Sequence, residues 1–135
     1  MKPSDRRRAR KLVVQALYQW QLAETPLADL EQQFLNTANV KKVDVSYGRA
    51  LLIDVIKHVT DIDEKIVPLL DRKITALNPV ELAILRLAVS ELLYQKDVPD
   101  KVVINEALEL TKIFGSVAGF KYVNAVLDRL VKSTA

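Results

Sequence analysis

Residues 78–95 read NPVELAILRLAVSELLYQ, a helix start followed by an almost unbroken apolar segment. Asn78 can cap the helix, Pro79 suits its first position, and Glu81 places an acid in the first turn. Apolar side chains then occupy nearly every side of the predicted helix: Val80, Ala83, Ile84, Leu85, Leu87, Ala88, Leu92 and Leu93. Because a helix that is apolar all round is normally buried, we expect residues 78–95 to lie at the centre of the core.

Two amphipathic helices are predicted at the start of the chain. Ser4 or Asp5 can cap the first, which runs to about Ala23 and has the apolar stripe Ala9, Val13, Ala16, Leu17 and Trp20. Thr25 as N-cap and Pro26 as first residue suit the second, whose stripe is Leu27, Leu30, Phe34 and Leu35.

A third helix is predicted after a polar loop over residues 36–43. Asp44 can cap it, and its inward side is Tyr47, Leu51, Leu52, Val55, Ile56 and Val59. Residues 61–64, Asp-Ile-Asp-Glu, have the spacing of a capping box, which indicates either a short new helix or a bend in a long one. Pro68 limits how far that helix continues.

Two helices are predicted after the central one. Residues 97–100, Asp-Val-Pro-Asp, indicate a turn, and the next helix ends at Phe114 with Gly115 at C′. Residues 102–104 could form a short strand, but no second strand offers them a partner. The last helix covers about residues 118–132 and buries Val123, Val126, Leu127 and Leu130.

These patterns predict an all-α fold, a compact bundle of six or seven helices in one domain over residues 1–135. Only three glycines occur, and all-β domains usually need more of them in turns. The charged start is unlike a secretory signal, no apolar run reaches the roughly 18 residues of a membrane span, and cysteine is absent. We therefore expect a soluble, cytoplasmic protein.

The chain offers no constellation that is typical of an enzyme. Without cysteine there is neither a thiolate zinc site nor a cysteine nucleophile. The single histidine, His58, has no second ligand and no serine–acid pattern near it, so a structural role is expected. The acids of residues 61–64 lack a loop of EF-hand spacing, and no glycine-rich phosphate loop exists. We expect no catalytic site, no metal and no cofactor.

Positive charge is concentrated at the N-terminus. Residues 1–11 carry six basic groups against the single acid Asp5, a net charge of +5, whereas the remaining 14 basic and 16 acidic groups leave a net charge of −2. The basic side chains of this segment are Lys2, Arg6, Arg7, Arg8, Arg10 and Lys11. A basic arm on a mildly acidic body indicates an anionic partner, although such runs also occur as solvated helix ends.

Exposed aromatic rings beside these cations favour nucleic acid as the partner. Tyr18 is predicted on the same helix face as Arg7 and Lys11, away from the apolar stripe, and a ring beside cations suits stacking on single-stranded bases. The last helix repeats the combination with Tyr122 on a flank and Lys121, Arg129 and Lys132 opposite the core. Tyr122 at the edge of the core is an equally good interpretation of that helix alone.

Several separated motifs resemble the NusB (N-utilisation substance B) family, in order and from end to end. They are residues 6–10 (RRRAR), 14–18 (VQALY), 97–99 (DVP), 103–110 (VINEALEL), Phe114-Gly115 and 121–124 (KYVN). The resemblance implies two small helical bundles packed together. It also implies a transcription antitermination factor that binds the boxA element of nascent RNA with ribosomal protein S10. That pair joins other Nus factors on RNA polymerase and suppresses premature termination, notably in ribosomal RNA operons.

The resemblance also assigns roles to individual residues. The family's RNA-contacting start falls on Arg6, Arg7, Arg8 and Arg10, its exposed aromatic falls on Tyr18, and Tyr122 replaces a phenylalanine of the last helix. Glu81 is a candidate contact for ribosomal protein S10, although capping alone would explain it. With the neighbouring cations, the predicted RNA-binding residues are Lys2, Arg6, Arg7, Arg8, Arg10, Lys11, Tyr18, Lys121 and Tyr122.

The chain departs from the family at two places. Ala125 stands where a glycine usually follows Asn124, and residues 115–119 are less acidic than expected. The same fold begins certain ribosomal RNA cytosine methyltransferases, but no glycine-rich cofactor loop is present here, so methyl transfer is not expected. The alternative to RNA binding is a helical protein–protein adaptor without nucleic-acid affinity, which the basic arm disfavours.

Overall fold

The computed structural model describes residues 2–38, 42–115 and 117–134, and within these ranges it contains helices and no strand. The elements are α1 (Pro3–Ala23), α2 (Leu27–Thr37), α3 (Val45–Lys57), α4 (Val59–Ile66), the short 3₁₀ helices η1 (Val67–Leu69) and η2 (Ile74–Ala76), α5 (Pro79–Tyr94), α6 (Asp100–Phe114) and α7 (Val117–Thr134). The predicted all-α class is therefore confirmed.

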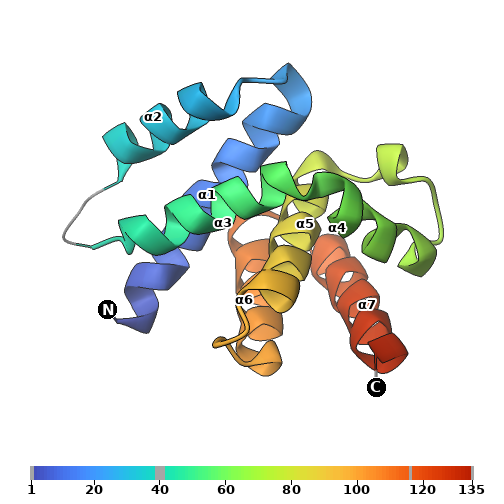
Figure 1. The fold of residues 1–135 in the computed structure, drawn as a ribbon. Helices are drawn as coiled ribbons and strands as arrows, with labels where there is room; N and C mark the ends of the chain where they lie inside the picture. Colours follow the sequence, from blue (N-terminus) through green and yellow to red (C-terminus); the bar gives the residue numbers. More distant parts are fainter. Residues whose placement is uncertain (1, 39–41, 116, 135) are drawn as a thin grey trace.

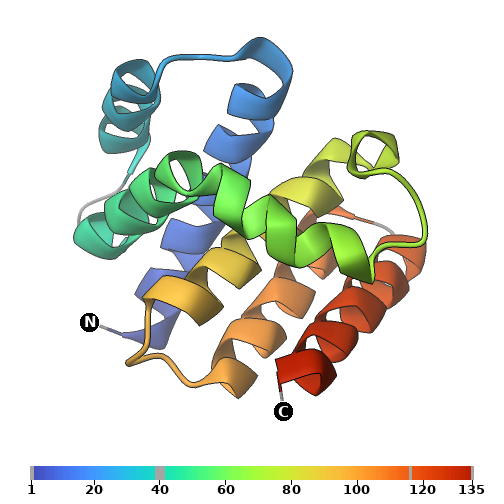
Figure 2. The ribbon, with the colours of Figure 1, turned by 45° about the vertical axis from the view of Figure 1, so that its right-hand side comes forward.

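The helices form two groups, which meet where α1 and α3 pack against α5 (Figure 1). α1, α2 and α3 make the N-terminal group, and α4 to α7 make the C-terminal group, in which α5, α6 and α7 lie side by side (Figure 2). α1 runs antiparallel to α5, since Arg10 reaches Glu91 near the end of α5 and Gln21 reaches Pro79 at its start. This packing brings the basic end of α1 beside α6.

α5 is the centre of the core, as its sequence predicts. Eight of its residues are buried, including Ile84, Leu85 and Leu87. It packs against α1, α3, α4, α6 and α7, which explains why its apolar residues are not limited to one stripe. None of the helices in the described ranges combines the length and the apolar character needed to cross a membrane.

The predicted caps of α3 and α5 are confirmed, whereas the starts of α1 and α2 differ from the prediction by one to three residues. Asn78 accepts hydrogen bonds from the backbone N–H groups of Val80 and Glu81, and Asp44 accepts one from Tyr47. α1 instead begins at Pro3 after Lys2, and α2 begins at Leu27 because Pro26 keeps an extended ψ of 145°. Proline at the first position of α1 explains the earlier start, since its missing N–H would be unpaired there anyway.

The bend after α3 lies at His58 and not at the predicted capping box of residues 61–64. His58 has φ −114° and ψ 22°, which ends α3, and α4 starts at Val59 so that Asp61 falls within its first turn. The imidazole stacks on Tyr94 with ring centroids 4.4 Å apart. His58 therefore lies at a helix junction and not within one helix.

Three further details differ from the sequence prediction. Leu35 is 40% exposed because Leu30 and Phe34 already make the contact of α2 with the core. Gly115 has an extended backbone, φ −116°, and not a left-handed one; a Cβ there would lie 2.8 Å from the Thr111 carbonyl oxygen, so close approach explains this glycine. α7 extends beyond the predicted 118–132 at both ends.

Candidate nucleic-acid interface

The first turn of α1 is fixed to the rest of the fold through Asp5. Its carboxylate accepts a hydrogen bond from the backbone N–H of Lys2 at 3.3 Å and pairs with Arg8 at 3.4 Å. The Asp5 carbonyl oxygen accepts the backbone N–H of Asp44, the cap of α3, at 3.1 Å. The basic segment is therefore an ordered helical surface in the described structure.

Arg10 was predicted to lie on the RNA-binding surface, and the structure corrects this. Its side chain is 3% exposed and does not lie on the surface with the other cations. Its Nε and one Nη donate to both carboxylate oxygens of Glu91, at 2.7 and 2.9 Å, and Tyr47 donates its hydroxyl to Glu91 at 2.7 Å. Burial opposes the charge on Arg10, but hydrogen bonding and the charge of Glu91 outweigh it and raise the Arg10 pKa. Arg10 joins α1 to α5.

Tyr47 is the third member of this buried network. Burial first, and then the hydrogen bond to the Glu91 carboxylate, raise the pKa of its hydroxyl well above the ordinary value of a tyrosine. The outer face of its ring is covered by Arg6, whose guanidinium carbon lies 4.1 Å from the ring centroid. The phenol therefore remains protonated and donates its hydrogen bond to Glu91 at physiological pH.

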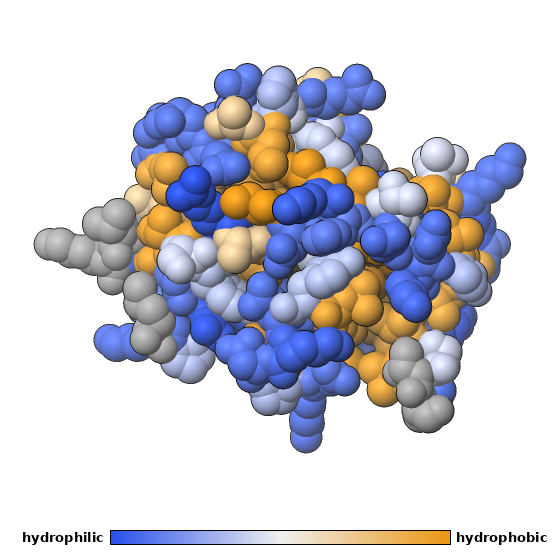
Figure 3. Space-filling view, viewed as in Figure 1, coloured by the Kyte–Doolittle hydropathy of each residue, from blue (hydrophilic) through white to orange (hydrophobic). Residues whose placement is uncertain are grey.

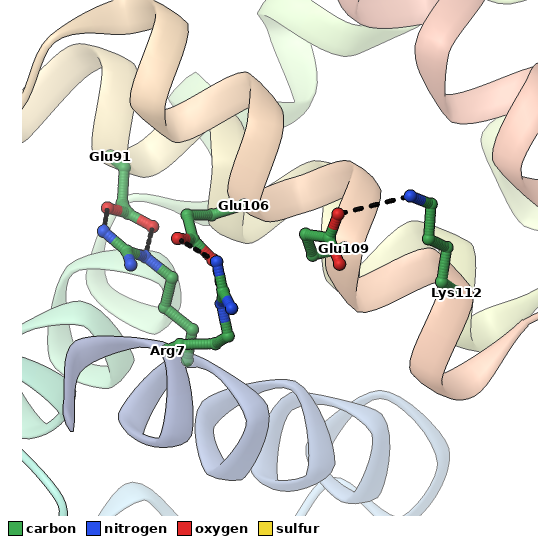
Figure 4. A network of polar contacts seen from close by, with 6 residues as sticks. Arg7, Glu91, Glu106, Glu109 and Lys112 are labelled. Carbon is green, nitrogen blue, oxygen red and sulfur yellow. Dashed lines mark hydrogen bonds and ion pairs between the residues drawn. The ribbon is translucent and has the colours of Figure 1, made fainter. Parts of the chain in front are cut away.

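Arg7 lies across the gap between α1 and α6 (Figure 4). Its Nε and one Nη donate to the two carboxylate oxygens of Glu106, at 2.9 and 3.0 Å. Donating these hydrogen bonds to the Glu106 carboxylate raises the Arg7 pKa. Glu106 is only 11% exposed, whereas Arg7 is 50% exposed and keeps an outer edge toward solvent. One turn further along α6, Glu109 pairs with Lys112 at 3.2 Å.

The remaining cations of the arm are on the surface. Arg6 is 3.5 Å from Asp44 and 35% exposed, and Arg8 is 51% exposed and also donates to the Lys42 carbonyl oxygen. Lys2 and Lys11 are exposed as well. Five of the six predicted basic residues of the N-terminal segment therefore offer charge to a ligand.

The two predicted aromatic residues of α1 have different surroundings. Tyr18 is 40% exposed, so its ring can be reached by a ligand. Trp20 is partly buried against the core and lies 5.7 Å from the Arg86 guanidinium, measured to the ring centroid. The predicted division between an exposed Tyr18 and an inward Trp20 is confirmed in direction, although Trp20 is not fully covered.

Tyr122 is engaged with the segment between η1 and η2. Its hydroxyl donates to Asp71 at 3.3 Å, and the Arg72 guanidinium carbon lies 4.6 Å from its ring centroid. Hydrogen bonding from Arg72 lowers the pKa of Asp71. Lys121 beside it is exposed, as predicted. Sequence reasoning missed Arg72, because no local pattern relates residue 72 to residue 122.

Glu81 lies at the junction of α5, α6 and α7. With Ile84, Phe114 and Gly119 it lines a cavity of about 250 Å³, and a Cβ at Gly119 would lie 3.2 Å from a Glu81 carboxylate oxygen. Asn78 caps α5, so the carboxylate of Glu81 is not required for that role.

Ala125, the first departure from the family pattern, is half-buried. Of residues 115–119, Ser116 lies outside the described residues.

Hydrophobic surface is exposed elsewhere, on the face that carries α4 and α7 (Figure 3). A cleft between α5 and α7 has Leu92, Leu93 and Val131 among the residues that line it. Among the residues that the structure describes, no group of three or more histidine, cysteine or acidic side chains could hold a metal ion.

Comparison with known proteins relates this arrangement to a family. The NusB family model matches residues 7–132. Transcription antitermination protein NusB of Shewanella amazonensis is 54% identical over 131 residues, which are 97% of this chain and 98% of that protein. A structure of T. maritima NusB is similar with a TM-score of 0.84 and 32% identity, over 98% of this chain and 93% of that one. A chain in the crystal structure of antitermination factors NusB and NusE in complex with double-stranded RNA has a TM-score of 0.82 and 28% identity, over 94% of this chain and 96% of that one.

Proposed function

Since this chain belongs to the NusB family, we propose that it is a transcription antitermination factor that binds the boxA element of nascent RNA together with ribosomal protein S10. In this role it joins the other Nus factors on RNA polymerase and suppresses premature termination in ribosomal RNA operons. Relatives at about half identity carry the name transcription antitermination protein. We expect the chain to act in the cytoplasm and to have no enzymatic activity of its own.

The similarity to the NusB–NusE–RNA complex carries this proposal. It extends over 94% of this chain and 96% of the related one. NusE is ribosomal protein S10, so that complex contains the protein partner proposed here together with an RNA, which is double-stranded there. A helical adaptor without nucleic-acid affinity would not need the exposed cations of α1.

The proposed RNA surface is built from exposed and partly exposed residues of α1, its N-cap Lys2 and α7. Charge comes from Lys2, Arg6, Arg7, Arg8, Lys11 and Lys121, and rings for stacking come from Tyr18 and Tyr122. Arginine presents a planar fork that suits phosphate oxygens, and such contacts supply affinity without sequence information. Arg10 supports this surface from inside by joining α1 to α5 and does not contact RNA.

The proposed S10 contact is Glu81. Its side chain is half-buried near the surface where α5, α6 and α7 meet, and it is not needed as a helix cap. A carboxylate placed in this way can accept hydrogen bonds from a partner protein.

The test is a titration of labelled RNA with the full chain, with and without S10. We expect S10 to tighten binding to a boxA strand, and by linkage RNA should tighten S10 binding by the same factor. A scrambled strand and a boxA duplex are measured in parallel, since the related complex contains double-stranded RNA. Absence of RNA binding under all these conditions would leave the protein–protein adaptor as the function.

A further inference from the structure

Each arginine of the basic segment has an acidic partner in the free protein. Arg6 lies near Asp44, Arg7 near Glu106, Arg8 near Asp5 and Arg10 near Glu91. RNA therefore meets a surface on which much of the positive charge is already compensated. Contacts between cations and phosphates carry no sequence information, so charge alone does not explain how such a surface selects its ligand.

The Arg7–Glu106 pair differs from the other exposed pairs because two parallel hydrogen bonds join it across two helices, whereas Arg6 lies 3.5 Å from Asp44 and Arg8 lies 3.4 Å from Asp5 in the same helix. Two nitrogens of Arg7 are bound to Glu106, at 2.9 and 3.0 Å, while half of the Arg7 side chain is open to solvent. Glu106 is 11% exposed and lies within α6, so its carboxylate is held behind the more exposed Arg7 guanidinium. Any phosphate on the outer edge of Arg7 has this fixed negative charge behind the guanidinium (Figure 4).

We infer that Glu106 is a specificity-determining residue, which holds Arg7 in one orientation and weakens its attraction for phosphates that do not match that orientation. This inference rests on the proposed RNA-binding function. Glu106 does not contact RNA in this scheme and acts through Arg7 as a positioning residue.

Glu106 has two opposing effects on RNA binding. The first is repulsion between its carboxylate and a phosphate bound to Arg7. For two unit charges roughly 6 Å apart, this repulsion changes the binding constant by about threefold at a dielectric constant of about 80, and by about a hundredfold at about 20. Every phosphate on Arg7 feels this repulsion. A matching phosphate also gains from meeting a guanidinium that is already oriented, because less side-chain freedom is lost on binding. Only the matching strand receives this compensation.

The test uses Glu106→Gln, which removes the charge and keeps the size of the side chain. For a scrambled single strand we expect affinity to rise roughly three- to tenfold. The slope of log affinity against log salt should steepen by about 0.7, as for one more neutralised phosphate. For a boxA strand we expect a change within about twofold, so discrimination between the two strands falls.

Glu109→Gln is the matched control, since it makes the same change of net charge one turn away in α6, where the partner is Lys112. It should leave the discrimination between strands unchanged. In an Arg7→Ala background, Glu106→Gln should no longer alter RNA binding, because the effect passes through Arg7. If Glu106→Gln does not fold, Arg7→Lys takes its place as the test variant. Lysine keeps the charge but cannot be held by two parallel hydrogen bonds, so discrimination between the strands should also fall.

Three results would overturn the inference: equal effects of Glu106→Gln and Glu109→Gln, weaker binding of both strands by Glu106→Gln, or an effect that persists without Arg7. The proposed function fails separately if the wild-type chain binds neither strand with or without S10, and the inference then fails with it.

Discussion

At the residue scale, Arg8 and Arg10 lie two positions apart in α1 and have opposite environments. Arg10 is 3% exposed and its partner Glu91 is 2% exposed, whereas Arg8 is half exposed and pairs with Asp5 in the same helix. Removing one partner of a buried pair leaves an uncompensated charge in a medium that solvates it poorly. Side chains of the same type in one basic run therefore serve different purposes.

We predict that Arg10→Ala lowers the free energy of unfolding by about 3–5 kcal/mol. Arg8→Ala, the matched control, should lower it by at most about 1 kcal/mol, because exposed ion pairs contribute little. Chemical denaturation of both variants provides the measurement. Similar losses for the two arginines would show that Arg10 is not a buried structural residue.

Tyr18 and Trp20 provide a second prediction at this scale. Tyr18→Ala should leave the melting temperature nearly unchanged and weaken RNA binding about tenfold, because a stacked base contributes about 1–3 kcal/mol. Trp20→Ala should mainly lower stability, by less than the about 3–5 kcal/mol of a fully buried aromatic residue. Thermal melting is measured beside RNA and S10 titrations. Unchanged RNA affinity with weaker S10 binding would place Tyr18 in the protein interface instead.

At the scale of the element, the start of α5 carries two polar side chains with different roles: Asn78 is the helix cap and Glu81 is the proposed S10 contact. Asn78 accepts the backbone N–H groups of Val80 and Glu81, at 2.9 and 3.4 Å. The side chain of Glu81 points to the junction with α7, where Gly119 lies close. The two neighbouring polar residues should therefore respond to different measurements.

We predict that Asn78→Ala lowers the free energy of unfolding by about 0.5–2 kcal/mol, since it removes the N-cap. Glu81→Gln should change stability by less than about 0.5 kcal/mol, as for a surface substitution, and should weaken S10 binding. Denaturation and an S10 titration of both variants test this. If Glu81→Gln binds S10 as the wild type does, Glu81 is not part of that interface.

At the scale of the whole molecule, the fold decides how much of the basic segment can meet RNA. With Arg10 buried and the other arginines near acids, we expect contact with about four phosphates of a single strand from Lys2, Arg6, Arg7, Arg8 and Lys11. Log affinity should then fall with log salt with a slope of roughly −3.

Replacing Arg7 and Arg8 together with alanine should flatten this slope by about 1.4, the contribution of two phosphate contacts to a single strand. The measurement is RNA affinity at several salt concentrations. Lys132, which pairs with Asp128 at the far end of α7, is the control position, and its replacement should leave the slope unchanged. An unaltered slope without Arg7 and Arg8 would show that the basic segment is only a solvated helix end.

The sequence by itself determined the helices, the central position of α5 and the basic character of the N-terminus. These features depend on local patterns: Asn78-Pro79 at a helix start, and apolar residues three or four positions apart. The motifs quoted for the NusB family carried the functional hypothesis. Helix boundaries were less well predicted, because Pro26 and residues 61–64 suit more than one position near a helix end.

Only the tertiary structure decided which cations are available. Arg7 and Glu106 are 99 positions apart, and Arg10 and Glu91 are 81 positions apart, so no periodicity within one helix relates them. The same holds for Arg72, which covers Tyr122 from a segment 50 positions earlier in the chain. Whether an arginine is a ligand contact or a buried ion pair depends on its burial and on the acids that face it, and both are set by how the helices pack.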